Sequence, residues 1–137
     1  MSAPTSDDPR FWEGIRCFNQ RAFFAAHEVW EDIWREEPAP VRTFLQGLIQ
    51  LAVSLHHFGR GNGRGARRLY HSGQRYLQPY RPHHRGVDVD RLLADMAVCC
   101  ADLTANEDDP QATLNPALIP TIRLTGEPAD GALGAGL

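Results

Sequence analysis

Apolar residues recur at helical spacing through most of this 137-residue chain, and no stretch alternates in the way that a half-buried strand does. Cap and turn residues divide the pattern into five predicted helices. We expect N-caps at Asp7 or Asp8, at Asn62 and at Asp88, and the five helices cover about 8–19, 22–37, 38–58, 63–80 and 89–105. The pattern therefore predicts an all-α, single-domain bundle of about five helices arranged as antiparallel hairpins.

The second and third predicted helices are the most apolar, and each carries one narrow polar row. At about 100° of turn per residue, His27, Glu31 and Trp34 share one side of the second helix. On the third helix one side carries Gln46, Gln50, Val53 and His57, and apolar residues cover nearly all the remainder. A helix that is apolar nearly all round is a central one. We therefore expect the third helix at the centre, with its polar row facing that of the second.

The length fits one domain with a single core. We expect a flexible N-terminus at 1–6, the helical domain at 7–105, an irregular segment packed on the body at 106–125, and a disordered, glycine-rich tail at 126–137. The three cysteines, Cys17, Cys99 and Cys100, lack the spacing of a zinc site and are expected to be reduced core thiols.

No run approaches the roughly 18 apolar residues that a membrane span needs. The first residues also lack the basic and apolar regions of a secretion signal, so we expect a cytoplasmic protein without a membrane partner. The sequence is compatible with a homo-oligomer.

Charge is sorted along the chain. Residues 38–87 contain eight arginines and no acidic residue, while the segments on either side are acidic and the net charge is −3. The basic middle can form a surface for an anion, or it can be matched by its own neighbours after folding. The sequence pI of about 6.0 argues against a nucleic-acid partner. The chain contains no lysine, which excludes a Schiff-base lysine and a P-loop lysine.

The spacing of His27 and Glu31, one helical turn apart, suits one metal ion or one shared proton. His57, with Gln46 or Gln50, could complete a divalent-metal or small-ligand site, and we name His27, Glu31 and His57 as the metal-ligand candidates. The segment HEVWE has glutamate where a zincin motif has its second histidine, so that motif is only half present.

Two other interpretations of the same residues stay open, so the sequence does not decide whether the protein is an enzyme. His27 oriented by Glu31 could be a general base, but Ser54 at the edge of the row lacks the context of an activated nucleophile. Alternatively, His27, Glu31, Gln46, Gln50 and His57 could satisfy one another as a structural polar network that sets the helix register.

Arginines are concentrated in the fourth predicted helix and in the turn before it. The glycines of 59–65 and a helix N-terminus could hold an anion near Arg64, Arg67 and Arg68. One side of the helix forms a solvated basic stripe, which consists of Arg64, Arg68, His71 and Arg75. The alternative to a ligand pocket is an interaction module that binds an anionic partner with this stripe. In that module the polar network is purely structural.

Three segments together resemble the domain-of-unknown-function 309 family. They are FFAAHEVWEDIW, then FLQGLIQLAVSLHH, then GN followed three residues on by GA, at Gly61, Asn62, Gly65 and Ala66. The match covers about Phe11 to Leu77. The resemblance implies a small helical bundle packed somewhat like tetratricopeptide repeats. It also implies shared polar positions, which fall here on His27, Glu28, Glu31, Gln46, Gln50, His57 and Asn62, and it implies no activity.

Overall fold

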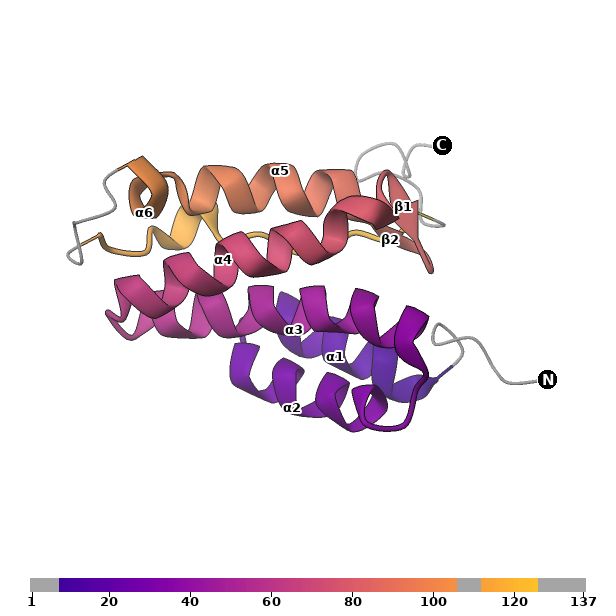
Figure 1. Cartoon of the computed structure of the whole chain (residues 1–137). Helices are drawn as coiled ribbons and strands as arrows, with labels where there is room; N and C mark the ends of the chain where they lie inside the picture. The colour runs from indigo at the N-terminus through magenta and orange to yellow at the C-terminus, as the bar shows by residue number, and fades with distance from the viewer. Residues whose placement is uncertain (1–7, 106–111, 126–137) are drawn as a thin grey trace, which may run out of the picture.

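The computed structural model describes residues 8–105 and 112–125, and its fold is all-α, as the sequence predicts (Figure 1). Within those residues lie six α-helices: α1 (Pro9–Asn19), α2 (Phe23–Trp34), α3 (Ala39–Gly59), α4 (Gly63–Leu77), α5 (Val89–Cys99) and α6 (Ala101–Ala105). Two short strands, β1 (His83–His84) and β2 (Val87–Asp88), form an antiparallel hairpin. Short 3-10 helices lie at Gln78–Tyr80 and Pro116–Leu118.

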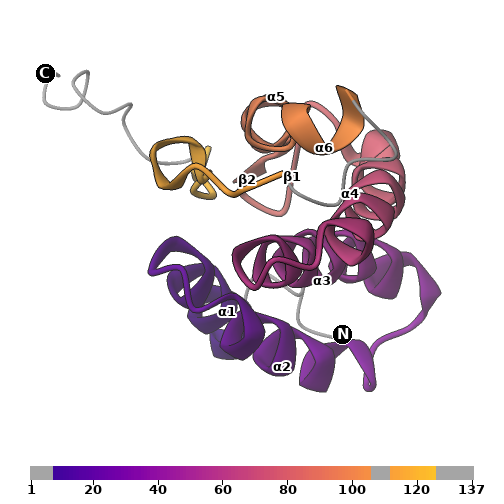
Figure 2. The ribbon, with the colours of Figure 1, turned by 90° about the vertical axis from the view of Figure 1, so that its left-hand side faces the viewer.

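The helices are stacked as successive pairs. Figure 1 shows α3 between α2 and α4, with α5 on the other side of α4. The view along the helices in Figure 2 shows α1 with α2, then α3 with α4, then α5 with α6. The third helix is therefore central, because it packs against both α2 and α4.

The predicted N-caps are confirmed at three helices. The side chains of Asp8, Asn62 and Asp88 accept hydrogen bonds from the backbone N–H groups at the starts of α1, α4 and α5. Each cap satisfies one of the N–H groups that a helix start leaves without a partner.

Local differences from the expected elements have identifiable causes. The helix expected to reach Tyr80 ends at Leu77, because Pro79 has no N–H to continue it. The helix expected over 89–105 is divided at Cys100, whose φ of −97° and ψ of 10° are not helical. Arg85 and Gly86, expected in a loop, both have positive φ and close the β1–β2 hairpin. Arginine rarely adopts that conformation, so the sequence does not signal this turn.

The core beneath α1 and α2 is organised around Trp30, which is fully buried. Its indole Nε1 donates a hydrogen bond to the backbone oxygen of Phe11 at 3.1 Å. A Cβ atom at Gly14 would lie 2.1 Å from this indole, so the ring reaches α1 only because residue 14 has no side chain.

A second close approach joins α3 to α4. A Cβ atom at Gly47 would lie 2.6 Å from the side chain of Leu77, and one at Gly73 would lie 3.0 Å from that of Leu51. Ser54 is fully buried, and its hydroxyl donates to the backbone oxygen of Ala66 at 2.6 Å. Ser54 therefore links α3 to α4, and this hydrogen bond is a structural reason for a polar side chain at the edge of the row.

Residues 112–125 cross the helical body at α1 and β2. Asn19 makes two hydrogen bonds with the backbone of Ile122, at 2.7 and 3.1 Å, and Leu124 pairs with Val87. The expected flexible N-terminus at 1–6, the first part of the expected irregular segment (106–111) and the expected tail at 126–137 lie outside the described residues.

Candidate functional site

The predicted pair on α2 is formed. His27 Nε2 lies 3.6 Å from Glu31 Oε2, and the other oxygen of Glu31 accepts a hydrogen bond from Arg35 at 3.0 Å. The His27 side chain is 18 % exposed, and Phe24 packs on its ring with a centroid distance of 4.9 Å. His27 Nδ1 is buried and has no hydrogen-bond partner among the described residues.

Two contacts set the register of α2 against α3. The guanidinium of Arg42 lies 3.9 Å from the ring centroid of Trp34, and the rings of Phe24 and His56 are 5.1 Å apart. In an antiparallel pair these contacts place Glu31 at the level of Gln46, and His27 at the level of Gln50. The side-chain oxygen of Gln50 is also buried without a hydrogen-bond partner among the described residues.

His57 lies farther along α3. It is seven residues beyond Gln50, which at 1.5 Å per residue is about 10 Å along the helix. Its Nδ1 lies 3.3 Å from the side-chain nitrogen of Asn62. Burial, followed by the positive charges of His56, Arg68 and Arg60, lowers the pKa of His57.

The three predicted metal ligands are not brought together. In residues 8–105 and 112–125, no group of three His, Cys, Asp or Glu side chains is placed to hold one metal ion. Glu28 is exposed, and Trp34 is half-buried beneath Arg42. The metal site suggested by His27, Glu31 and His57 therefore gains no support from the geometry.

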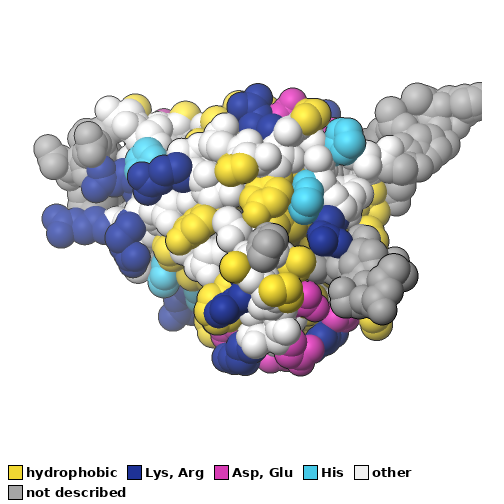
Figure 3. All heavy atoms as spheres, turned by 45° about the vertical axis from the view of Figure 1, so that its right-hand side comes forward, with side chains coloured by type: hydrophobic (Ala, Val, Ile, Leu, Met, Phe, Trp, Pro, Cys, Tyr) yellow, Lys and Arg dark blue, Asp and Glu magenta, His cyan; other side chains and the backbone are white. Residues whose placement is uncertain are grey.

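The outer face of α4 carries four exposed side chains, which we call the basic strip: Arg64, Arg68, His71 and Arg75. Together with Asn62, Gly65 and Arg67 they line a hollow of about 710 Å³. No carboxylate of the described residues lies within ion-pair distance of Arg64, Arg68 or Arg75, whereas Arg16, Arg35 and Arg91 all have such partners. On the left of Figure 3, several dark-blue basic side chains gather, and none of the described side chains seen among them is acidic.

Two smaller hollows continue this surface along α4. The first, of about 400 Å³, shares Arg75 with the large hollow and is also lined by Ser72 and Tyr76. The second, of about 210 Å³, shares Tyr76 with the first and lies between α2, α3 and α4. Its other lining residues are Trp34, Ala39, Arg42, Thr43 and Gln46. The hollows thus form a track from the start of α4 to the start of α3.

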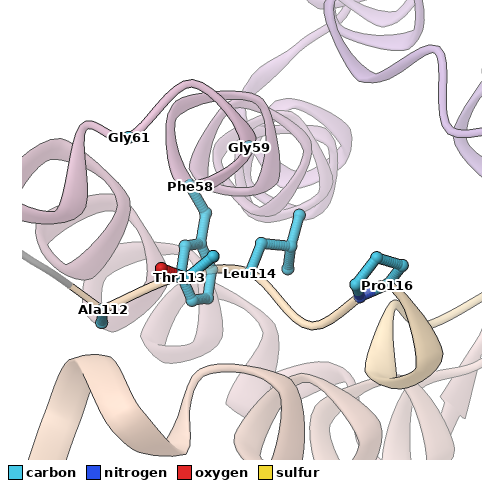
Figure 4. Close-up of a pocket in the computed structure, with 7 residues that line it drawn as sticks. All are labelled: Phe58, Gly59, Gly61, Ala112, Thr113, Leu114 and Pro116. Carbon is cyan, nitrogen blue, oxygen red and sulfur yellow. The ribbon is translucent and has the colours of Figure 1, made fainter.

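Another hollow, of about 470 Å³, lies between the α3–α4 turn and residues 112–116. Figure 4 shows Phe58 and Leu114 extending into it from opposite sides. None of the described residues that line it is charged, so they offer no ionic group that would select a charged ligand.

Sequence reasoning identified the basic strip but missed Arg42 and Tyr76. Tyr76 is 40 % exposed and lines both of the smaller hollows. A signal for Arg42 exists, because it is a basic residue in the first turn of α3, where the helix dipole disfavours positive charge.

Residues 11–69 match the model of a protein family described as "Domain of unknown function (DUF309)", which confirms the resemblance seen in the sequence. Over 79 residues the chain is 42 % identical to "Uncharacterized protein YpuF" of Bacillus subtilis (strain 168). The aligned region is 53 % of this chain and spans 44 % of the length of YpuF. In the described residues, no helix is long and apolar enough to cross a bilayer.

Proposed function

We propose that this chain, whose residues 11–69 carry the DUF309 domain, is an interaction module that binds an acidic polypeptide segment along the basic strip of α4. The observation that carries the proposal is the hollow lined by Arg64, Arg68, His71 and Arg75, in which none of the described lining residues is acidic. Arginine forks match carboxylates in a bidentate geometry, so carboxylates of a partner would complete them.

The spacing of the strip suits an extended partner. Arg64 and Arg68 are four residues apart, which is a rise of about 6 Å along a helix. Alternate side chains of an extended chain point the same way and are about 6.6 Å apart. A segment with acidic residues at alternate positions would therefore place two successive carboxylates beside Arg64 and Arg68, while Arg75 lies about 10.5 Å beyond Arg68 along the helix. From Arg64 to Arg75 the strip is about 16 Å long, enough for roughly five extended residues.

A polypeptide partner fits this face better than a nucleic acid. Among the described residues, no Phe, Tyr or Trp lines the hollow of the strip, so it lacks the large aromatic platform on which unpaired bases stack. The sequence pI of about 6.0 is also below the basic range that is typical of nucleic-acid-binding domains.

The test is a titration with a fluorescently labelled hexaglutamate peptide, followed by anisotropy at low and at physiological salt. We expect saturable binding that weakens with salt, because exposed charge pairs are screened. Neutralising the strip in R64Q/R68Q/R75Q should weaken binding at least tenfold.

The matched control is R16Q/R35Q/R91Q, which removes the same charge from arginines that already form ion pairs in the structure. An equal loss of binding in the control would show that only net charge matters, and would refute the proposal. Tighter binding of a single-stranded oligonucleotide than of the peptide would also refute it.

A small polar ligand between α2 and α3 is a second candidate function. It is favoured by His27 Nδ1 and Gln50 Oε1, two buried polar atoms at the same level without protein partners among the described residues. Buried polar groups normally have partners, so a ligand or a bound water molecule could supply them.

This second candidate is tested by measuring metal content after incubation with Zn²⁺, Fe²⁺ or Mn²⁺, and melting temperature with small polar ligands. His27→Ala should abolish any uptake at a small cost in stability. If nothing binds and the substitution costs about 1–3 kcal/mol of the free energy of unfolding, the row is a structural network.

A further inference from the structure

Arg42 stands apart from the basic strip, at the other end of the track of hollows. Its guanidinium carbon lies over the ring of Trp34, 3.9 Å from the ring centroid. Such stacking restricts the orientation of the side chain, so the fork of N–H groups is pre-organised before any ligand arrives.

Among the described residues, no carboxylate balances the positive charge of Arg42. None of the described acidic side chains lies within ion-pair distance of Arg42, and its Nε is buried without a hydrogen-bond partner among the described residues. Arg42 is in the first turn of α3, a helix of 21 residues with no acidic residue in that turn. The positive end of the helix dipole and the guanidinium therefore favour the same kind of ligand, an anion.

The other groups of the hollow complete a site for one small anion. Gln46 and Tyr76 line it with Arg42, and none of the described residues that line it is acidic. Glu31, at the level of Gln46, is already bound by Arg35 at 3.0 Å, so its charge is compensated locally. The volume of about 210 Å³ has room for a carboxylate and a short apolar group against Trp34 and Ala39.

We propose that this hollow binds the C-terminal carboxylate of a polypeptide, with Arg42 as the bidentate donor and Gln46 and Tyr76 as additional donors. This inference rests on the proposed function only for the choice of a polypeptide as the partner. The hollow at Arg42 is joined to the basic strip through Tyr76 and Arg75. An acidic segment bound along the strip can therefore end in this hollow. A planar carboxylate matches the planar fork of arginine.

The first experiment uses a probe without acidic side chains, so that it does not depend on the basic strip. N-acetylglycylglycine and its C-terminal amide are titrated into ¹⁵N-labelled full-length protein, and the resonances of Arg42 Nε and the Trp34 indole are followed. The free acid should shift both resonances in a saturable way, and the amide should shift neither. Equal shifts with the two probes, or none with the acid, would overturn the proposal.

Variants and a second ligand identify the source of the carboxylate. R42Q should abolish the shift at Trp34, and R42K, which keeps the charge but loses the fork, should weaken binding about tenfold; R16Q is the charge-matched control. Acetate should bind at least fivefold more weakly than the dipeptide acid. Equal affinity for acetate would mean that the site does not recognise the end of a polypeptide.

The outcome is separable from that of the proposed function. If R64Q/R68Q/R75Q leaves hexaglutamate binding unchanged while the dipeptide acid still shifts Arg42, the basic strip is refuted and the carboxylate site stands. If hexaglutamate and its C-terminal amide bind wild-type protein equally tightly and the dipeptide acid has no effect, the strip stands and the carboxylate site is refuted.

Discussion

The two sides of α4 differ in almost every physical respect although they share one backbone. The inner side consists of small and apolar residues, including Ala66, Gly73 and Leu77, which are buried against α3. The outer side carries the basic strip, which is exposed. Burial of apolar surface and close packing stabilise the fold, whereas exposed charges contribute little to it. The contrast indicates that the inner side maintains the fold and that the outer side is available for a partner.

The largest expected effect is on the inner side, from Leu77→Ala. Leu77 is fully buried over Gly47, so truncation removes buried methyl groups and leaves a cavity. We expect a loss of about 2–5 kcal/mol in the free energy of unfolding, measured by urea denaturation. A loss below about 1 kcal/mol would contradict the tight packing of α3 on α4.

Gly73→Ala should have a smaller effect of the same sign. Alanine raises helix propensity by up to about 1 kcal/mol. Its Cβ, however, would lie 3.0 Å from Leu51 and 3.2 Å from the backbone oxygen of Gly47. Overpacking costs typically about 1–3 kcal/mol, so after the gain in propensity we expect a net loss of up to about 2 kcal/mol. Gly59→Ala is the control, because its Cβ would meet only Leu114, at 3.7 Å. Stabilisation by Gly73→Ala would contradict the prediction and show that α3 and α4 separate easily.

Asn62→Ala acts at the end of α4, where the two sides meet. It removes the cap on the N–H of Gly65, so we expect a loss of about 1 kcal/mol in thermal or urea unfolding. Asn62→Asp keeps an acceptor and adds a negative charge at the positive end of the helix dipole, so it should retain most of the stability. Equal losses in the two variants would show that the contact with His57 matters more than the cap.

The pH dependence of stability tests the lowered pKa of His57, which lies near the start of α4. His57 has a lowered pKa in the folded state, mainly from burial and then from His56, Arg68 and Arg60. Below the unfolded-state value of about 6.5, the unfolded chain binds the proton more readily than the folded one. Stability should therefore fall as the pH falls through that value, and His57→Gln should flatten the slope between pH 7 and 5. An unchanged slope would exclude His57 as the source of the pH dependence. The pKa of His84 is also lowered, so His84 should contribute to the pH dependence of stability in the same direction.

The smallest expected effect on stability is that of R64Q/R68Q/R75Q. These exposed arginines have no ion-pair partner in the part of the chain that the structure describes. Each substitution should change the free energy of unfolding by less than about 0.5 kcal/mol, even as peptide binding is lost. A loss of several kcal/mol in urea denaturation at low salt would mean that the strip is structural.

The sequence predicted the elements of the fold well because the signals for them are local. The caps at Asp8, Asn62 and Asp88 depend on residues two or three positions along the chain. The central place of α3 follows from its nearly continuous apolar surface. The division at Cys100 could not be predicted, because the surrounding residues favour a helix and nothing local marks the interruption.

The candidate site was predicted less completely, because it depends on which residues of different helices lie at the same level. The His27–Glu31 pair was predictable from spacing within one helix, and the structure forms it. His57 was grouped with that pair because all three are on polar rows, but helical periodicity specifies only direction around the axis. The position along the axis, which separates His57 from Gln50 by about 10 Å, decides whether side chains can meet.

By itself, the sequence determined that this protein is helical, that α3 is central and that the outer side of α4 is basic. These properties follow from periodicity and composition within single segments. Only the tertiary structure decided that Arg42 stacks on Trp34, that Gly47 and Gly73 let two helices approach closely, and that Tyr76 joins the strip to the hollow at Arg42. The physical reason is that such contacts depend on the register between helices, which is set by packing over the whole core.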